Sequence, residues 1–191
     1  MKVVIGLVGQ KRAGKGASIE FLKKMAAPAR VGRIGFSDVL FETLSAWGIE
    51  PSRENLQRLV VVMDDTYGAG TLTRAVAQRV GKTDADIIVL DGVRWETDVR
   101  MLREFPNNFL VYITADPHVR FERTRQSAEK AGEAEVTFRQ FMKEEEAPNE
   151  LLIPKIGAEA DFHIINNRTL DHLEDQVKTF YETLLTPHSF L

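Results

Sequence analysis

The sequence predicts a three-layer α/β/α fold in which a five-stranded parallel sheet carries helices on both faces. Three observations support this prediction. Strand-like and helix-like segments alternate along the chain, an order that produces right-handed crossovers and a parallel sheet. Residues 86–92 are almost continuously apolar, as in strands that are buried on both faces. A glycine-rich loop, residues 9–16, lies between the first strand-like run and the first helical stripe.

Composition favours one globular domain, and we expect residues 1–191 to form a single unit. The formal net charge of −3 argues against a surface devoted to nucleic acid or to anionic lipid. The absence of cysteine excludes disulfides and thiolate metal sites and favours a cytoplasmic location. The N-terminal apolar run is too short for a signal peptide or a membrane span. We expect a monomer or a homodimer.

Five short apolar runs, each bounded by turn residues, predict the strands. They cover residues 2–8, 31–36, 86–92, 109–113 and 160–165.

Helices are predicted between the strands, because apolar residues recur there at helical spacing. Capping residues mark several starts: Asp116-Pro117 puts proline at a first helical position, and Thr137 with Gln140 gives a capping box. The first helix follows the glycine-rich loop and stops near Pro28, and the others cover about residues 37–48, 52–67, 71–80, 97–105, 116–125, 137–147 and 170–184. We expect the polar residues 126–136 to form a mobile connection.

The glycine-rich loop carries the clearest chemical signal, since it reads G-x-x-x-x-G-K between a strand and a helix. Its glycines allow successive backbone N–H groups to point at a phosphate chain, and the helix N-terminus adds positive partial charge. Lys15 would bring a mobile positive charge to the β- and γ-phosphates. The alternative is a plain glycine turn. The predicted nucleotide-binding residues are Gly9, Lys11, Arg12, Ala13, Gly14, Lys15, Gly16 and Ala17.

The metal position departs from the usual pattern of such loops. Gly16 stands where serine or threonine normally offers a hydroxyl to Mg²⁺. Asp91 ends an apolar strand, as the acidic residue of a Walker B element does, and we expect it to hold Mg²⁺ through water. The alternative is a carboxylate that caps the next turn. Gly92 follows where many hydrolytic ATPases have glutamate, which favours transfer to a bound acceptor.

Other polar residues follow the remaining strands, at the edge where parallel α/β sheets bind ligands. Asp38 would orient an acceptor or take its proton, and its alternative is a helix N-cap. Arg94, together with Arg74, would hold an acceptor phosphate, and the alternative for Arg94 is a surface salt bridge. Asn166 would rest against adenine, and its alternative is a turn residue.

Arg120 and Arg123 lie one turn apart on one face of the helix that follows the fourth predicted strand. Phosphoryl transfer needs positive charge around the equatorial oxygens and a closing segment that expels water. We therefore expect these two arginines to stabilise the phosphoryl group in transit. The alternative is a solvated basic face.

Taken together, these residues resemble the P-loop kinase group that includes nucleoside monophosphate kinases. Phage-type deoxynucleoside monophosphate kinases, animal-type phosphomevalonate kinases and dephospho-CoA kinases are the nearest likenesses. The likeness spans almost the whole chain, and its most specific part is the glycine-rich loop. The residues that carry it are 9–15, 36–38, 91–94, Arg120, Arg123, Arg125 and 165–166.

The resemblance implies a P-loop NTPase fold with ATP and Mg²⁺ as cofactors and a nucleotide or small phosphorylated acceptor as partner. Residues 38–80 would form the acceptor-binding helical region, and residues 120–145 a lid-like region. The implied activity is transfer of the γ-phosphoryl group to a (deoxy)nucleoside monophosphate. Two alternatives remain: a dephospho-CoA-type or other small-metabolite kinase, and an ATP-binding sensor or adaptor without turnover.

Overall fold

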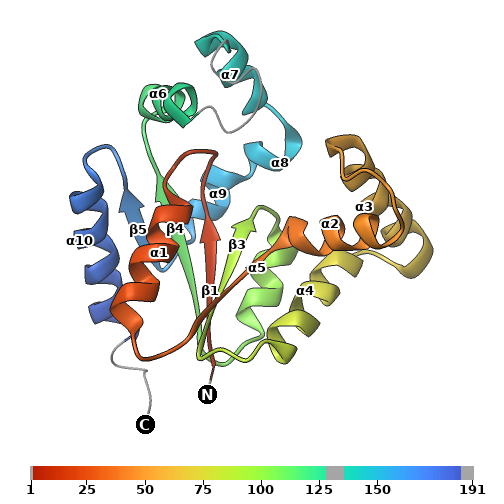
Figure 1. Ribbon diagram of the computed structural model, residues 1–191, viewed down its shortest axis with the longest axis horizontal. Coiled ribbons are helices and arrows are strands. Elements are labelled where there is room, and N and C mark those ends of the chain that lie inside the picture. The colour runs from red at the N-terminus through yellow and green to blue at the C-terminus, as the bar shows by residue number, and fades with distance from the viewer. Residues whose placement is uncertain (1, 128–135, 186–191) are drawn as a thin grey trace.

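The computed structural model describes residues 2–127 and 136–185, and it confirms the three-layer fold (Figure 1). Five parallel strands form one sheet in the order β2-β3-β1-β4-β5, so the strand before the glycine-rich loop is central. The strands are β1 (Val3–Val8), β2 (Val31–Gly35), β3 (Ile87–Val93), β4 (Asn108–Thr114) and β5 (Phe162–Ile165).

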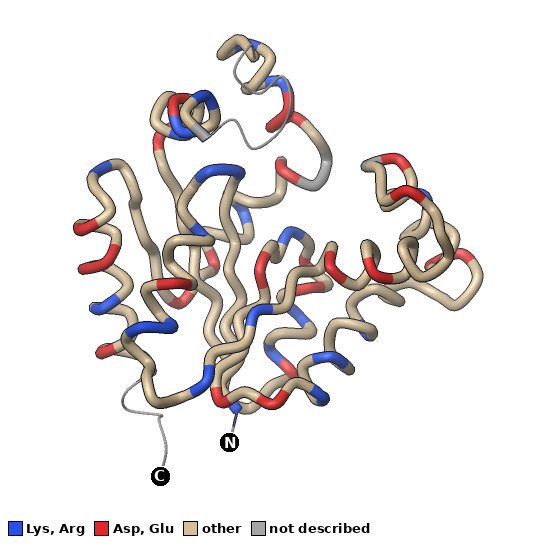
Figure 2. Tube along the Cα trace, viewed as in Figure 1, with Lys and Arg blue, Asp and Glu red and all other residues tan. Residues whose placement is uncertain are grey.

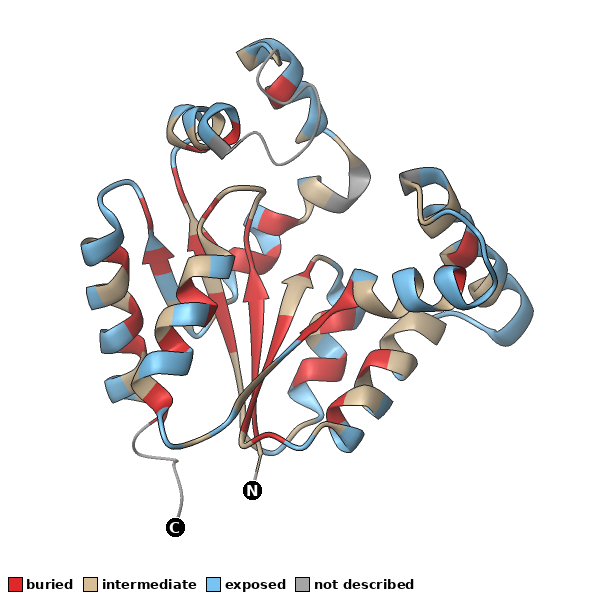
Figure 3. Ribbon diagram, viewed as in Figure 1, coloured by how far each residue is buried: buried red, intermediate tan, exposed pale blue. Residues whose placement is uncertain are grey.

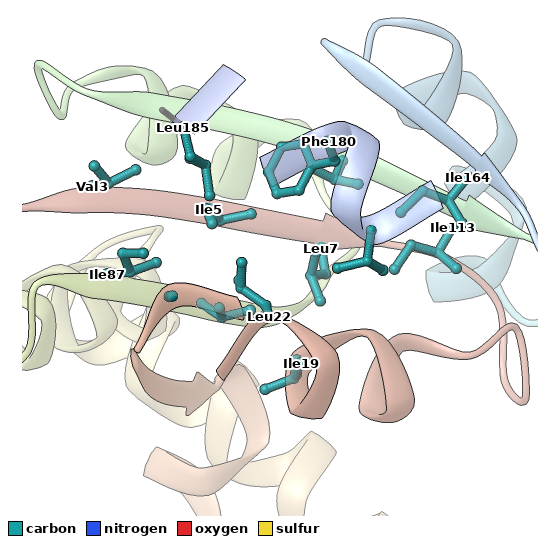
Figure 4. Packing of buried hydrophobic residues seen from close by; sticks show 14 of the residues in the cluster. Val3, Ile5, Leu7, Ile19, Leu22, Ile87, Ile113, Ile164, Phe180 and Leu185 are labelled. Carbon is teal, nitrogen blue, oxygen red and sulfur yellow. The ribbon is translucent and has the colours of Figure 1, made fainter. Parts of the chain in front are cut away.

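Two apolar layers cover the sheet, and β1 contributes to both because its side chains alternate between the faces. Val3, Ile5 and Leu7 join the layer under α1 (Lys15–Ala26) and α10 (Leu170–Phe180), which Figure 4 shows from close by. Val4 and Val8 join the opposite layer. That layer lies under α4 (Thr71–Lys82), α5 (Glu96–Arg103) and α9 (Ile153–Ala158).

The remaining helices extend beyond the sheet near the carboxyl ends of its strands (Figure 1). On the β2 side are α2 (Phe36–Ala46) and α3 (Arg53–Tyr67). On the β4 side are α6 (Pro117–Ser127), α7 (Phe138–Glu144) and α8 (Pro148–Leu151). Most of the connection expected over residues 126–136 lies outside the described residues. Within the described ranges, no helix has both the length and the apolar character needed to cross a bilayer.

Three differences from the sequence predictions exceed small shifts of element bounds. Strand β2 ends at Gly35, which caps α2, so Asp38 is the third helical residue and not the N-cap. The sequence patterns do not predict α8 and α9, because these helices are short and each has a proline among its first two residues. Helix α10 ends at Phe180 and continues as a π-helical turn over Tyr181–Leu185.

Candidate active site

The glycine-rich loop joins β1 to α1 and requires glycine at both of its ends. Gly14, the N-cap of α1, has a φ of 114°, in the left-handed region that glycine tolerates best. A Cβ on Gly14 would lie 2.3 Å from Asn166 Nδ2, and one on Gly9 would lie 2.2 Å from the Ile113 carbonyl oxygen. The loop backbone is therefore packed tightly against the ends of β4 and β5.

Lys15 is folded back onto the loop that precedes it. Its Nζ donates to the carbonyl oxygens of Gly9 at 2.8 Å and of Gln10 at 3.0 Å. Burial lowers the pKa of Lys15, while the nearby Asp91 carboxylate acts in the opposite direction. A desolvated ammonium held by neutral carbonyl oxygens gains electrostatic energy when an anionic phosphate oxygen approaches it. Lys15 is thus prepared to bind an anion.

Asn166 is attached to the loop by a hydrogen bond. It is 3% exposed, and its Nδ2 donates to the Ala13 carbonyl oxygen at 2.9 Å. Arg123 of α6 donates to the carbonyl oxygen of Asn166 at 3.0 Å and to its Oδ1 at 3.2 Å, and to the Arg12 carbonyl oxygen at 3.4 Å. Asn166 and Arg123 therefore connect the end of β5, the loop and α6.

Arg33 lies between the two carboxylates that the sequence singles out. It donates through Nε to Asp91 Oδ2 at 2.9 Å and through Nη1 to Asp38 Oδ2 at 3.1 Å. The same oxygen of Asp38 accepts from the Gly35 backbone N–H at 2.8 Å. Arg33 was not predicted from the sequence, although a charged residue in the middle of an apolar strand is a signal of such a role.

A magnesium site is compatible with these residues only if the nucleotide supplies most of the ligands. Among the described residues, no group of three or more His, Asp or Glu side chains is arranged to hold a metal. Nucleotide-bound Mg²⁺ usually takes one or two carboxylates and completes its shell with phosphate oxygens and water. Asp91 would supply one such carboxylate. A Cβ on Gly16 would have nothing within 4 Å, so there is open space beside the loop at this position.

A cavity of about 890 Å³ extends from Lys15 to the helices on the β2 side. Its charged end is formed by Lys15, Arg33, Asp91 and Arg94. Apolar side chains line much of the rest, contributed by α2, α3, α4 and the residue after Arg94. They are Phe36, Leu40, Leu56, Val60, Val61, Leu72 and Trp95. This volume is within the range of ligand pockets, and mixed charged and apolar walls suit an amphipathic small molecule.

The turn after β3 presents Arg94 and Trp95 to this cavity, and Asp98 fixes the turn. Asp98 Oδ2 accepts from the backbone N–H groups of Arg94 and Trp95, both at 3.0 Å. Burial raises the pKa of Asp98 to about 6, although these two hydrogen bonds act against the rise. The guanidinium of Arg94 forms an ion pair with Glu150 of α8.

The other predicted arginines have separate partners. Arg120 is 2% exposed; its Nε donates to the Ala115 carbonyl oxygen at 2.9 Å, and its guanidinium pairs with Glu145. Arg123 instead contacts the loop and Asn166, so Arg120 and Arg123 have different partners. Arg74 donates to the carbonyl oxygens of Ala69 at 2.8 Å and Tyr67 at 3.1 Å, in the turn between α3 and α4.

Comparison with known proteins supports the fold. No protein-family model matches the chain. A UPF0200 protein of Hyperthermus butylicus is 25% identical over 183 residues, covering 96% of this chain and 95% of the relative. Shikimate kinase from Bacteroides thetaiotaomicron has a TM-score of 0.60 at 18% identity, over 95% of this chain and 98% of that one. TT1252 from Thermus thermophilus has a TM-score of 0.63 at 14% identity, over 96% and 98%. The chain therefore has the three-layer fold of P-loop kinases.

Proposed function

We propose that this protein is an ATP-dependent phosphotransferase that moves the γ-phosphoryl group of ATP to a small acceptor. One observation carries the proposal: the lysine of the glycine-rich loop lines the same cavity as Arg33, Asp91 and Arg94. A nucleotide held by the loop amides would direct its terminal phosphate into that cavity. Donor and acceptor would then meet at the charged end, where positioning and charge neutralisation drive in-line transfer.

A (deoxy)nucleoside monophosphate is the acceptor that we propose. Phe36 and Trp95 offer aromatic surface on which a nucleobase can pack. The guanidinium of Arg94 can donate two hydrogen bonds to the phosphate of the acceptor. A phosphate acceptor is already a strong nucleophile, so no general base is required. The contacts of Asp38 agree with such an acceptor, because its carboxylate already accepts from Arg33 and from the Gly35 N–H and is not needed as a base. Residues 38–80 would then form the acceptor-binding region.

A hydroxyl-bearing small metabolite is the second candidate. Shikimate kinase, a structural neighbour, is named for such a substrate, and the cavity here is also lined by carboxylates of Asp64 and Asp98. A hydroxyl acceptor would need a base, and Asp38, which pairs with the cavity residue Arg33, would take that role once Arg33 moves away. An ATP-binding sensor without turnover remains the non-enzyme alternative, because Gly16 lacks the usual hydroxyl.

Each residue of the candidate active site would have a separate role that follows from its position. Lys15 and the loop amides would hold the β- and γ-phosphates, with Asn166 and Arg123 keeping the loop in shape. Mg²⁺ would neutralise phosphate charge, with Asp91 as its protein ligand, directly or through water. Arg120 would reach the phosphoryl group only after its pair with Glu145 opens. Within the predicted lid-like region 120–145, the described residues 120–127 and 136–145 would act as the lid.

An ADP-release assay across nucleoside monophosphates, dephospho-CoA and small hydroxylated acids tests the proposal. We expect turnover with at least one monophosphate, and Lys15→Ala should lower kcat/KM by about 10³-fold or more, because its charge acts on the moving phosphoryl group. Lys23→Ala, an exposed lysine that pairs with Glu20 on α1, is the matched control and should retain wild-type rates.

Each outcome of the assay decides between the candidates. Turnover only with a hydroxyl acceptor would select the second candidate, and loss of that turnover in Asp38→Asn would support it. ATP binding without turnover of any acceptor would select the sensor. Wild-type activity in Lys15→Ala, with the fold intact by circular dichroism, would contradict the role of the loop.

A further inference from the structure

Three basic residues around the candidate active site are each paired with a carboxylate from one short stretch, which we call the acidic segment, residues 144–150. Lys11 of the loop lies 3.7 Å from Glu144, Arg120 of α6 pairs with Glu145, and Arg94 after β3 pairs with Glu150. Figure 2 shows that the acidic positions after α7 and the basic positions of the glycine-rich loop lie toward the same end of the molecule. The basic partners come from three separate parts of the chain.

The three pairs differ in how firmly they are held. The Arg120 and Glu145 side chains are 3% and 21% exposed, and the Arg120 guanidinium lies 5.7 Å from the centre of the Phe141 ring. Breaking a buried pair of this kind is costly, so it anchors the segment. The Lys11 and Glu144 side chains are 38% and 50% exposed, and an exposed pair contributes little.

Glu150 pairs with a residue that lines the cavity. Its side chain is 14% exposed and that of Arg94 is 35% exposed, so a ligand in the cavity would reach the pair through Arg94. After burial, the charges that act on the pKa of Lys15 include Asp91, Arg94 and Glu150, which places the Glu150 carboxylate within electrostatic reach of the loop lysine. A phosphate bound between Lys15 and Arg94 would repel that carboxylate.

We propose that the acidic segment is an internal competitor for phosphate: Glu150 occupies Arg94, and Glu144 lies beside Lys11, until a phosphorylated ligand displaces them. The buried pair of Arg120 with Glu145 keeps the segment attached while phosphate displaces Glu144 and Glu150, and this pair would open only for phosphoryl transfer. Phosphate binding is thereby coupled to release of α8 from the turn after β3. The inference rests on the proposed function, because it takes Arg94 and Lys11 as phosphate-binding residues.

Calorimetric titration of the full chain with inorganic tripolyphosphate tests the competition without requiring turnover. Glu150→Gln keeps the size of the side chain and removes its charge, so it should bind tripolyphosphate about threefold to tenfold more tightly than the wild type. Glu146→Gln, an exposed position of the same segment, makes the same change in net charge and should stay within about twofold of the wild type.

A fluorescence measurement follows the pair itself. In a Trp47→Phe background, Trp95 is the remaining tryptophan, and it is the residue next to Arg94. Tripolyphosphate should shift the Trp95 emission when Glu150 is present, whereas Glu150→Gln should show the shifted emission from the start. Equal affinity and equal emission in Glu150→Gln and wild type would overturn the inference and leave the proposed function standing. No binding of tripolyphosphate or ADP by the wild type would overturn both.

Discussion

The two sides of the candidate active site are built differently. On the nucleotide side, every residue of β1 is buried, and α1 buries Ile19, Leu22 and Ala26 against the sheet. On the acceptor side, α3 spans 15 residues and has Leu59 as its buried apolar residue, while Val61 and Val62 are 57% and 52% exposed (Figure 3). The nucleotide side is thus part of the core, and the acceptor side borders an open cavity.

The loop on the nucleotide side is therefore expected to keep one conformation, whereas α3 on the acceptor side is expected to change its position. The loop is held by backbone geometry and by Asn166, so it presents its amides in one arrangement. Helix α3 contributes Leu56, Val60 and Val61 to the lining of the cavity. Segments with few buried contacts open and shift at low cost in free energy. The acceptor side is therefore expected to adapt to what it binds.

Matched leucine truncations would test the comparison most strongly. Leu22 of α1 is 4% exposed within the core, so Leu22→Ala should lower the free energy of unfolding by about 3–5 kcal/mol. Leu56 of α3 lines the cavity, and Leu56→Ala should lower it by less than about 1 kcal/mol. Urea denaturation followed by circular dichroism measures both.

The same two variants separate stability from binding. Leu56→Ala should raise KM for the acceptor and leave KM for ATP near the wild-type value, because it removes part of the cavity wall on the acceptor side. Comparable destabilisation by the two substitutions would show that α3 belongs to the core, and the distinction between a fixed and an adjustable side would be wrong.

The nucleotide side could be predicted from the sequence because its determinants are local. Seven residues, 9–15, indicate both the conformation of the loop and the kind of ligand that it binds. The adjoining strand and helix are each indicated by the spacing of their own apolar residues. The sheet follows from the alternation of such segments, and the structure confirms the fold. Short helices such as α8 and α9 escape this reasoning, since they have too few residues for a periodic pattern.

The acceptor side could not be predicted at the same level. Asp38 and Arg94 were identified by their positions after strands, but their partners come from elsewhere in the chain. Arg33 reaches Asp91 across 58 positions, and Arg94 reaches Glu150 across 56. Such pairs depend on how the elements pack, which no local pattern encodes. The separation of Arg120 from Arg123 has the same cause, because each finds its partner in a different element.

Two glycines of the loop region provide the second test. Gly14→Ala would force alanine into a left-handed conformation and set its Cβ 2.3 Å from Asn166 Nδ2, so it should lower the free energy of unfolding by about 2–4 kcal/mol. Gly16→Ala lies in α1 with open space around its Cβ and should raise it by about 0.5–1 kcal/mol. Thermal or urea unfolding checks the opposite signs. Equal effects would mean that the backbone of the loop is not fixed as described.

Asp98 lies where the two sides meet, since it lines the cavity yet is buried like the core. Its pKa is raised from 3.8 to about 6 by burial. The folded protein therefore holds this proton more tightly than the unfolded chain does. The resulting stabilisation is complete below pH 3.8 and is lost as the pH rises to about 6, which amounts to about 1–3 kcal/mol.

Asp98→Asn should remove this part of the pH dependence while its amide oxygen still accepts from the turn. The difference in unfolding free energy between wild type and Asp98→Asn should therefore change between pH 4 and pH 6. Glu96→Gln is the matched control of opposite sign: a hydrogen bond from Lys155 lowers the pKa of Glu96, so its contribution is present at higher pH and lost as the pH falls. A pH-independent difference for Asp98→Asn would place its carboxylate in contact with bulk water, and the turn that carries Arg94 would then belong to the adjustable side.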